Sequence, residues 1–228
     1  MGTLYLVSTP IGNLKDITLR ALEILKKADL VACEDTRRTG LLLAHYQIKK
    51  PLLSYQEYNE LKRIPQIIQK LKSGQDIALV SDAGTPTLSD PGFKLVRECV
   101  REGLKVVAIP GPSAILAALT SSGLSTDKFI FLGYLPKKPG KRKTILENLG
   151  LQLKNMRITV ILFESPHRLL ATLKDLKEVS GNIEIVIARE LTKIHEEIER
   201  GEIAQFIKRF EKEKAKGEFT VLFEKESP

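Results

Sequence analysis

The sequence contains no tryptophan, only three histidines and only two cysteines among its 228 residues. Cys33 and Cys99 are too few to staple a chain of this length, and neither has a second cysteine or a histidine at metal-ligand spacing. No apolar run approaches the roughly 18 to 20 residues that cross a bilayer, and no basic segment precedes the short apolar N-terminal stretch. We therefore expect a cytoplasmic protein without a disulfide scaffold, a metal site or a membrane span.

Several common functional motifs are also missing. The sequence has no G-x-x-x-x-G-K-[ST] loop, no G-x-G-x-x-G after a strand and no G-x-S-x-G nucleophile frame. These absences count against nucleoside triphosphates, the usual dinucleotides and serine hydrolysis. We expect His45 on a helix face and His167 and His195 in polar loops, so a catalytic triad is not predicted.

The composition is that of a folded and basic protein. Hydrophobic residues make up 43% and charged residues 28%, which is enough apolar surface to offset the entropy of ordering the chain. Lys and Arg number 36 against 28 Asp and Glu, so the formal charge is +8. The length predicts one large domain or two small ones. The positive charge makes a polyanionic partner reasonable without identifying one.

Short aliphatic and β-branched runs alternate with helical patterns along nearly the whole chain. This alternation predicts an α/β fold with parallel or mixed sheets. A small-residue helix at 113–122 marks a boundary, which gives domains 1–112 and 113–228. We expect strands at residues 3–9, 30–34, 76–81, 105–109, 129–133, 158–164, 183–189 and 218–224. We expect helices at 37–46, 59–72, 93–102, 113–122, 166–179 and 202–212, and an earlier one capped by Asp16.

Five predicted strand ends run out into Gly, Pro and short polar residues, where open α/β sheets bind ligands. The turn from Asp82 to Pro86 combines a carboxylate, a glycine and a hydroxyl, and Asp90 follows shortly before the next helix. Taken singly, each turn could be only a tight connection, with Asp90 as a helix cap. Their clustering favours a binding site. The five segments are residues 8–14, 34–37, 81–86, 110–114 and 164–168.

Three charged clusters are candidates for chemistry or for anion binding. Residues 34–38 bring together two carboxylates and two guanidiniums, which suits a general base beside a phosphate ligand, or simply a helix start. Residues 189–193 form a similar cluster of charged groups, with the same two interpretations. Residues 136–143 form a predicted loop with five cations, which can neutralise phosphates or remain a solvated face. With 6% aromatic residues, recognition by shape and phosphates is expected, not an extensive base-stacking platform.

The ordered set of motifs resembles the tetrapyrrole methylase superfamily, and within it the branch that 2′-O-methylates a cytidine of 16S ribosomal RNA. Members that act on small molecules carry a G-x-G-x-G-D loop after the first strand. Here Thr9-Pro10-Ile11-Gly12-Asn13-Leu14 stands in its place, which favours the RNA branch. The segments that carry the resemblance are residues 4–14, 34–37, 80–86, 90–92, 110–114, 131–136, 164–168, 188–193 and 216–218.

The resemblance implies two α/β domains with S-adenosylmethionine in the cleft between them, and a homodimer. It also implies that the substrate is 16S ribosomal RNA in the small ribosomal subunit. Carried over segment by segment, the expected cofactor-binding residues are Pro10, Asp82, Gly84, Thr85, Ser113, Ala114, Phe163, Glu164, Ala188, Gly217, Glu218 and Phe219.

Methyl transfer to a ribose hydroxyl requires alignment and removal of a proton from a weak acid. The catalytic candidates are Glu34 or Asp35 as base, with Arg37 and Lys193 to hold phosphates or polarise the hydroxyl. Two alternatives stay open, a small-molecule methyltransferase on the same fold and a non-catalytic RNA-binding module. The expected RNA-binding residues are Lys137, Lys138, Lys141, Arg142, Lys143, Arg168 and Arg189.

Overall fold

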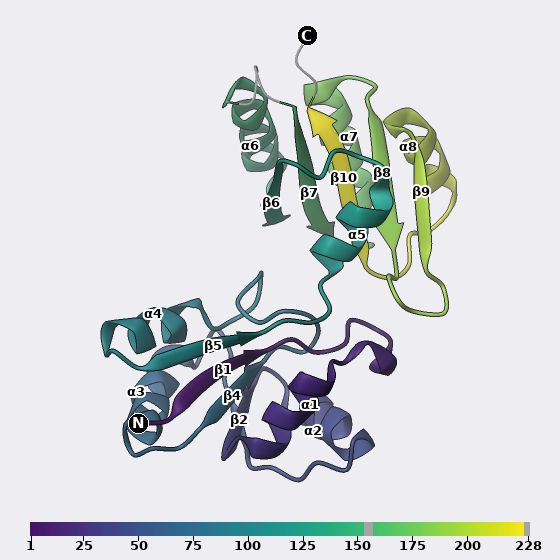
Figure 1. Ribbon diagram of the computed structural model, residues 1–228. Coiled ribbons are helices and arrows are strands. Elements are labelled where there is room, and N and C mark those ends of the chain that lie inside the picture. Colours follow the sequence, from purple (N-terminus) through teal and green to yellow (C-terminus); the bar gives the residue numbers. More distant parts are fainter. Residues whose placement is uncertain (153–156, 226–228) are drawn as a thin grey trace. The chain divides into compact units, whose positions relative to one another are not determined.

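The computed structural model describes residues 1–152 and 157–225. The chain divides into two compact units, Met1–Ser113 (unit 1) and Ala114–Pro228 (unit 2), drawn in Figure 1. The sequence places the boundary one position earlier. Each unit holds one five-stranded sheet with helices packed on it, so both are of the α/β class that the alternating pattern predicts. In the described ranges, no helix is long and apolar enough to cross a membrane.

Unit 1 is built on a parallel sheet with the strand order β3-β2-β4-β1-β5. Each neighbouring pair is parallel, and β1 pairs with both β4 and β5. Because the strands run in the same direction, their carboxyl ends lie along one edge, which we call the unit 1 edge. The strands are β1 (Thr3–Val7), β2 (Leu30–Cys33), β3 (Leu52–Ser54), β4 (Ile77–Val80) and β5 (Lys105–Ile109).

Helices cover both faces of this sheet (Figure 1). On one face, Leu4 packs with Leu71 of α3 and Leu95 of α4. On the other face, Val7 packs with Leu25 of α1 and with α2. Burial on both faces explains why the inner strands β2 and β4, all of whose residues are buried, are continuous apolar runs. The helices are α1 (Leu19–Lys27), α2 (Thr36–His45), α3 (Glu60–Lys72) and α4 (Phe93–Arg101).

The first helix begins later than the sequence predicts. Thr18 is its N-cap, because its hydroxyl accepts a hydrogen bond of 3.1 Å from the Ala21 amide. Asp16 instead belongs to a short 3₁₀ helix (η1, Leu14–Asp16) that precedes it. The prediction that Asp16 caps the helix is therefore wrong.

Unit 2 contains a mixed sheet with the order β6-β7-β10-β8-β9. Strands β6 and β7 are parallel, whereas β10 is antiparallel to both β7 and β8. The carboxyl ends of β6, β7 and β8 therefore meet the start of β10 at one edge, which we call the unit 2 edge. The strands are β6 (Phe129–Tyr134), β7 (Ile158–Glu164), β8 (Glu184–Arg189), β9 (Glu197–Glu202) and β10 (Phe219–Lys225).

Three helices cover one face of the unit 2 sheet, and α5 lies on the other (Figure 1). Leu146 of α6, Leu173 of α7 and Phe206 of α8 pack with Val160 and Val221 of the strands. Helix α5 contacts β8, β9 and β10. The helices are α5 (Ala114–Ser122), α6 (Pro139–Gln152), α7 (Leu169–Ser180) and α8 (Ile203–Lys212).

Two strands were not predicted, and both lie at sheet edges. Strand β3 has only three residues, and β9 has the sequence Glu-Ile-Glu-Arg-Gly-Glu. A strand that borders solvent needs few apolar residues, so its alternation is weak. Pairing with the neighbouring strand β2 or β8 defines these two elements instead.

The predicted basic loop at 136–143 is helical from Pro139 onward, as the first turn of α6. Proline is well tolerated there because its fixed φ suits the first helical position. Arg142 is only 2% exposed, and its Nε donates to Asp175 Oδ2 at 2.6 Å. The prediction that Arg142 binds RNA is therefore wrong, because its guanidinium is buried in an ion pair between α6 and α7.

Replacing Arg142 should destabilise unit 2. Arg142→Ala leaves the Asp175 carboxylate buried without its main partner, and breaking such a pair costs about 3 to 5 kcal/mol. The midpoint of urea unfolding, followed by circular dichroism, measures the loss. The matched control is Lys141→Ala, one residue away and exposed, which should shift the stability by less than about 0.5 kcal/mol. Equal midpoints for the two variants would contradict the buried pair.

Candidate functional site

At the unit 1 edge, the loops that follow β1, β4 and β5 are hydrogen-bonded to one another. The Thr9 amide donates to the Gly84 carbonyl at 2.9 Å, and the Gly84 amide donates back to Thr9 at 3.0 Å. The hydroxyls of Ser8 and Thr85 share a hydrogen bond of 3.1 Å, and Thr85 Oγ1 donates to the Pro112 carbonyl at 3.3 Å. Three segments far apart in sequence thus form one rigid rim of backbone and small polar groups.

Glycines allow this close approach of the loops. Gly84 has a φ of +79°, and a Cβ there would lie 3.3 Å from Ile11 Cγ2. A Cβ on Gly111 would lie 3.0 Å from Ser8 Cβ. A side chain at Gly84 would meet both the left-handed backbone and the neighbouring loop. The rim can therefore bring backbone amides and carbonyls directly to a ligand.

Carboxylates and guanidiniums occupy the ends of β2 and β4. Asp82 Oδ1 accepts a hydrogen bond of 3.0 Å from the Asp35 amide, and Asp82 Oδ2 lies 3.3 Å from Arg38 Nη1. The Asp35 carboxylate accepts two bonds from the Arg37 guanidinium, at 3.1 and 2.7 Å. The 34–38 cluster and the Asp82 turn, which the sequence treats separately, thus form one network.

The acidic side chains of this network differ in how readily they bind a proton. Burial, followed by the charge of Asp82, raises the pKa of Glu34. Burial, followed by the charge of Glu34, raises the pKa of Asp90 to about 6. Hydrogen bonds from Arg37 hold the pKa of Asp35 well below its usual range. Glu34 and Asp90 are therefore the stronger bases of the group, and Asp35 is a weak one.

Asp90 is a candidate site residue that the sequence leaves as a possible helix cap. The N-cap of α4 is Gly92, whose φ is +137° and where a Cβ would lie 2.8 Å from Leu79 Cδ2. Thr87 and Ser89 also have positive φ, at 75° and 64°, which is strained backbone for such residues. The turn between β4 and α4 is thus tightly constrained, and it holds Asp90 where the charge of Glu34 raises its pKa. The Ser-Asp-Pro-Gly sequence is the signal that marks it.

At the unit 2 edge, strand register aligns the predicted cofactor residues. Strand β10 lies between β7 and β8, so each residue near its start faces one residue on either side. This register gathers segments that are up to about sixty residues apart in sequence. The rows are Glu164, Phe219 and Arg189, followed by Phe163, Thr220 and Ala188.

The Glu164 carboxylate is committed to partners inside unit 2. It accepts bonds from the Ser165 amide at 2.8 Å and from Thr172 Oγ1 at 2.6 Å, and Arg168 Nε lies 3.4 Å away. Arg168 also donates to the Leu135 carbonyl. Both charged groups therefore support the edge from within, and Arg168 is not free to bind phosphate through its whole guanidinium.

Lys193 lies in the loop between β8 and β9 and is held by two carboxylates. Its Nζ donates to Glu190 Oε1 at 2.8 Å and to Glu218 Oε2 at 2.9 Å. Partial burial by itself lowers the pKa of a lysine. The hydrogen bonds to Glu190 and Glu218 outweigh this effect, so the pKa of Lys193 is raised. Gly217 is required beside this network, because a Cβ there would lie 2.5 Å from Glu190 Cγ. Lys193 is thus a fixed cation that cannot serve as a base.

The structure groups the predicted residues by unit. Ser113 and Ala114 stand at the division between the units, and the Arg189 guanidinium donates to the Lys216 carbonyl at 2.7 Å. No group of three or more potential metal ligands occurs among residues 1–152 and 157–225. The unit 1 edge holds Pro10, Glu34, Asp35, Arg37, Asp82, Gly84 and Thr85. The unit 2 edge holds Phe163, Glu164, Ala188, Arg189, Lys193, Gly217, Glu218 and Phe219.

The predicted RNA-binding cations after β6 are not equivalent. Lys143 is committed to Glu178, with its Nζ 2.6 and 2.7 Å from the two carboxylate oxygens. Lys137, Lys138 and Lys141 are exposed. None of these three is ion-paired with a carboxylate of the residues that the structure describes. They are the cations left available to an anionic partner.

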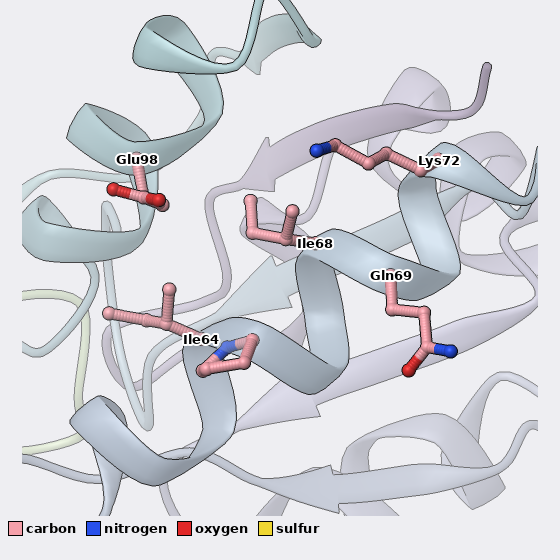
Figure 2. A pocket seen from close by; sticks show the side chains of 6 residues that line it. Ile64, Ile68, Gln69, Lys72 and Glu98 are labelled. Atoms are coloured by element: carbon pink, nitrogen blue, oxygen red, sulfur yellow. The ribbon is translucent and has the colours of Figure 1, made fainter.

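A groove of about 360 Å³ lies elsewhere, between α3 and α4 (Figure 2). Its lining combines aliphatic side chains with the charged side chains of Lys72 and Glu98. It includes none of the predicted site residues. Its lining is Ile64, Pro65, Ile68, Gln69, Lys72 and Glu98.

The sequence of this chain matches a known class of enzymes. The sequence model of the Tetrapyrrole (Corrin/Porphyrin) Methylases matches residues 3–207. The chain therefore belongs to the tetrapyrrole methylase family, and it is a methyltransferase of this class, which uses S-adenosylmethionine as methyl donor.

Two relatives of this chain carry names that are more specific than the family description. The chain is 51% identical over 222 residues to Ribosomal RNA small subunit methyltransferase I of Thermotoga maritima, covering 97% of this chain and 98% of the relative. It is 49% identical to the protein of the same name from a Synechocystis strain, covering 100% and 81%.

A solved structure shows the same fold at much lower identity. The uroporphyrin III C-methyl transferase of Thermus thermophilus superposes with a TM-score of 0.67 at 18% identity, covering 97% of each chain. This likeness concerns the fold and carries no statement about the substrate of this chain.

The residues at the unit 1 edge fit the methyl donor. The glycine-lined rim offers backbone groups at close range, as adenine and ribose require. The donor also carries a sulfonium and an ammonium, and a surrounding of Glu34, Asp82 and Asp90 supplies the opposite charge. The chemistry of the chain and of the cofactor therefore agree.

Replacing Asp90 should make the protein more stable at neutral pH. Because its pKa rises from 3.8 to about 6 on folding, stability is lost as pH increases through this interval and stays lost above it. Asp90→Asn removes this penalty, which is on the order of 1 to 2 kcal/mol after allowance for solvent screening.

Urea unfolding at about pH 4 and about pH 7.5 measures this effect. The gain in stability of Asp90→Asn should appear at the higher pH and nearly vanish at the lower. As a control, Asp127→Asn replaces an exposed carboxylate of unit 2 and should change little at either pH. An equal gain at both pH values would show that Asp90 does not titrate in this interval.

Proposed function

We propose that this chain transfers a methyl group from S-adenosylmethionine to the ribose 2′-oxygen of a cytidine in 16S ribosomal RNA. The observation that carries the proposal is the near-complete alignment with the ribosomal RNA small subunit methyltransferases, at about half of all positions. The choice of a cytidine 2′-oxygen, of 16S ribosomal RNA of the small subunit as substrate and of a homodimer rests on the resemblance of the motifs. The mass of the purified chain in solution tests the dimer.

The proposed cofactor contacts follow the two edges. In unit 1, Pro10, Gly84 and Thr85 offer backbone and hydroxyl groups, and Asp82 is oriented by the Asp35 amide. In unit 2, the half-buried Phe163 offers an apolar surface and Gly217 and Glu218 offer backbone groups. Ala188, Phe219 and Glu164 are buried and support them from within the unit. Ser113 and Ala114 complete the set. When bound, the donor supplies an activated sulfonium methyl, so the main task of these residues is alignment.

Proton removal from the ribose hydroxyl is assigned to Glu34. Its raised pKa supports a carboxylate oxygen that takes up the 2′-hydroxyl proton as the new carbon–oxygen bond forms. Asp35 is less suited, because both of its oxygens accept bonds from Arg37. In this scheme Asp35 orients Arg37, and Arg37 and Lys193 supply positive charge to the phosphates beside the target ribose.

Three lysines are the main proposed contacts to RNA. Lys137, Lys138 and Lys141 remain exposed, whereas Lys143 is paired with Glu178. Arg168 and Arg189 each donate to a backbone carbonyl, so at most part of each guanidinium can reach a phosphate.

The deciding experiment is transfer of labelled methyl to small ribosomal subunits that lack 2′-O-methylation, followed by nuclease digestion and mass mapping. Label on a cytidine 2′-oxygen is the expected result. Unlabelled RNA despite donor binding would favour a small-molecule acceptor. Binding of donor and RNA without any transfer would favour a non-catalytic role.

Substitutions of Glu34 and Asp35 should affect methylation differently. Glu34→Gln keeps the shape but removes the base, so the single-turnover rate should fall about 100-fold or more. Asp35→Asn should cost less and should act mainly through RNA affinity, because it releases Arg37. The control is Glu57→Gln, an exposed carboxylate of unit 1. Normal methylation by Glu34→Gln, with both substrates bound, would remove Glu34 from this role.

The lysines should determine how strongly salt weakens RNA binding. Each phosphate contact on single-stranded RNA contributes about 0.7 to the slope of log affinity against log salt concentration. Replacing Lys137, Lys138 and Lys141 by glutamine should therefore lower the slope by about 2. The matched triple variant is Lys26, Lys49 and Lys70 to glutamine, all exposed in unit 1. An equal change in both triple variants would indicate a general charge effect.

A further inference from the structure

Two arginines hold the chain at the point where it leaves β6. Arg168 donates to the Leu135 carbonyl, and Arg142 Nη1 donates to the next carbonyl, Pro136, at 3.4 Å. Each arginine is itself fixed by a buried carboxylate, Glu164 for Arg168 and Asp175 for Arg142. Consecutive carbonyls are thus anchored to β7 and α7, and the backbone on either side of them is preorganised.

The residue just before this anchor is an exposed aromatic. Strand β6 has a register shift between Phe131 and Tyr134, with Gly133 at a φ of +62°. This bulge places Tyr134 opposite Phe163 instead of one position further along β7. The ring centroids of Tyr134 and Phe163 are 5.8 Å apart, and those of Phe131 and Phe163 are 4.8 Å apart.

Tyr134 is the outer member of this aromatic group. Its side chain remains 54% exposed, while Phe131 and Phe163 behind it are half-buried. These side chains lie on the sheet face opposite α6, α7 and α8, because the alternate residues Val160 and Leu162 of β7 pack into that helical core. Phe163 fixes the position of the Tyr134 ring and leaves much of its surface open.

The residue that follows the anchor begins a set of exposed lysines, none of them ion-paired with a carboxylate among residues 1–152 and 157–225. Lys137 and Lys138 come directly after Pro136, and Lys141 lies on the first turn of α6. An exposed ring followed by several cations on a fixed backbone matches the needs of a single-stranded nucleotide, whose base stacks and whose phosphates are anionic. Lysines near an aromatic ring also suit an anionic membrane surface, and the relatives that are named for ribosomal RNA favour the nucleic acid.

We propose that Tyr134 stacks on an unpaired base of the ribosomal RNA next to the methylated nucleotide, while Lys137, Lys138 and Lys141 hold the adjoining phosphates. The inference rests on the proposed function, since it names the contact that selects unpaired RNA. In unit 2, Tyr134 neighbours Phe163, a proposed cofactor contact, so a base on Tyr134 lies beside the reacting ribose. Arg142 and Arg168 act as positioning residues for this platform.

The test uses the full chain and measures three quantities for each variant. They are the affinity for a short fluorescent single-stranded RNA, the affinity for S-adenosylmethionine, and the KM and kcat for small ribosomal subunits. Tyr134→Leu retains apolar contact with Phe163 but lacks a π face. We expect it to bind RNA roughly 5-fold to 100-fold more weakly and to raise KM, with donor affinity unchanged. Tyr134→Phe should remain close to the wild type.

The chain offers a matched control in Tyr58, which is 84% exposed in unit 1. Tyr58→Leu should change none of the three quantities. If Tyr134→Leu binds RNA normally, or loses donor affinity instead, the inference is overturned. Weaker binding to subunits with normal binding to free RNA would point to a ribosomal protein and would also overturn it.

Failure of the stacking contact can be distinguished from failure of the proposed function. If the wild-type chain methylates no ribosomal RNA, the proposed function fails. If the wild type methylates it and Tyr134→Leu does so with the same KM, only the stacking contact fails.

Discussion

Strand direction is the constraint on which both candidate sites depend. In unit 1, parallel pairing brings the ends of β1, β2, β4 and β5 to one edge, where the mutual hydrogen bonds of Thr9 and Gly84 join two of the loops. In unit 2, a single antiparallel strand, β10, has the same effect, because it makes β7 and β8 run in the same direction. Two different topologies therefore produce the same arrangement, in which chemical groups collect where parallel strands end.

The chemistry of the unit 1 edge depends on how a few arginines are distributed among several carboxylates. Arg37 is committed to Asp35 and Arg38 to Asp82, so Glu34 and Asp90 share a crowded acidic surrounding without a close ion pair of their own among the described residues. Neighbouring acids of the same type thereby acquire different proton affinities. This separation allows one carboxylate to accept a proton while another only orients a guanidinium.

Much of the fold was predictable because its signals are local. The runs at 105–109 and 158–164 predict strands, and the structure has both with the same bounds. The convergence of the strand ends followed from the α/β pattern. Arg142 was not predictable, because its fate depends on Asp175, which is 33 residues away. The surroundings of Asp90 likewise come from Glu34 on another loop. The roles assigned to the site residues stay predictions.

The outer strand of the unit 2 sheet also has a consequence for solubility during folding. Strand β9 presents Glu197 and Glu199, which Arg209 of α8 contacts from the same side, and Arg200 donates to the Ser122 carbonyl. A strand from another molecule that added to this edge would have to displace or bury these charges. The high charge of the sequence Glu-Ile-Glu-Arg-Gly-Glu makes this strand hard to predict from hydrophobic alternation. The same charge protects the open edge of the sheet from aggregation.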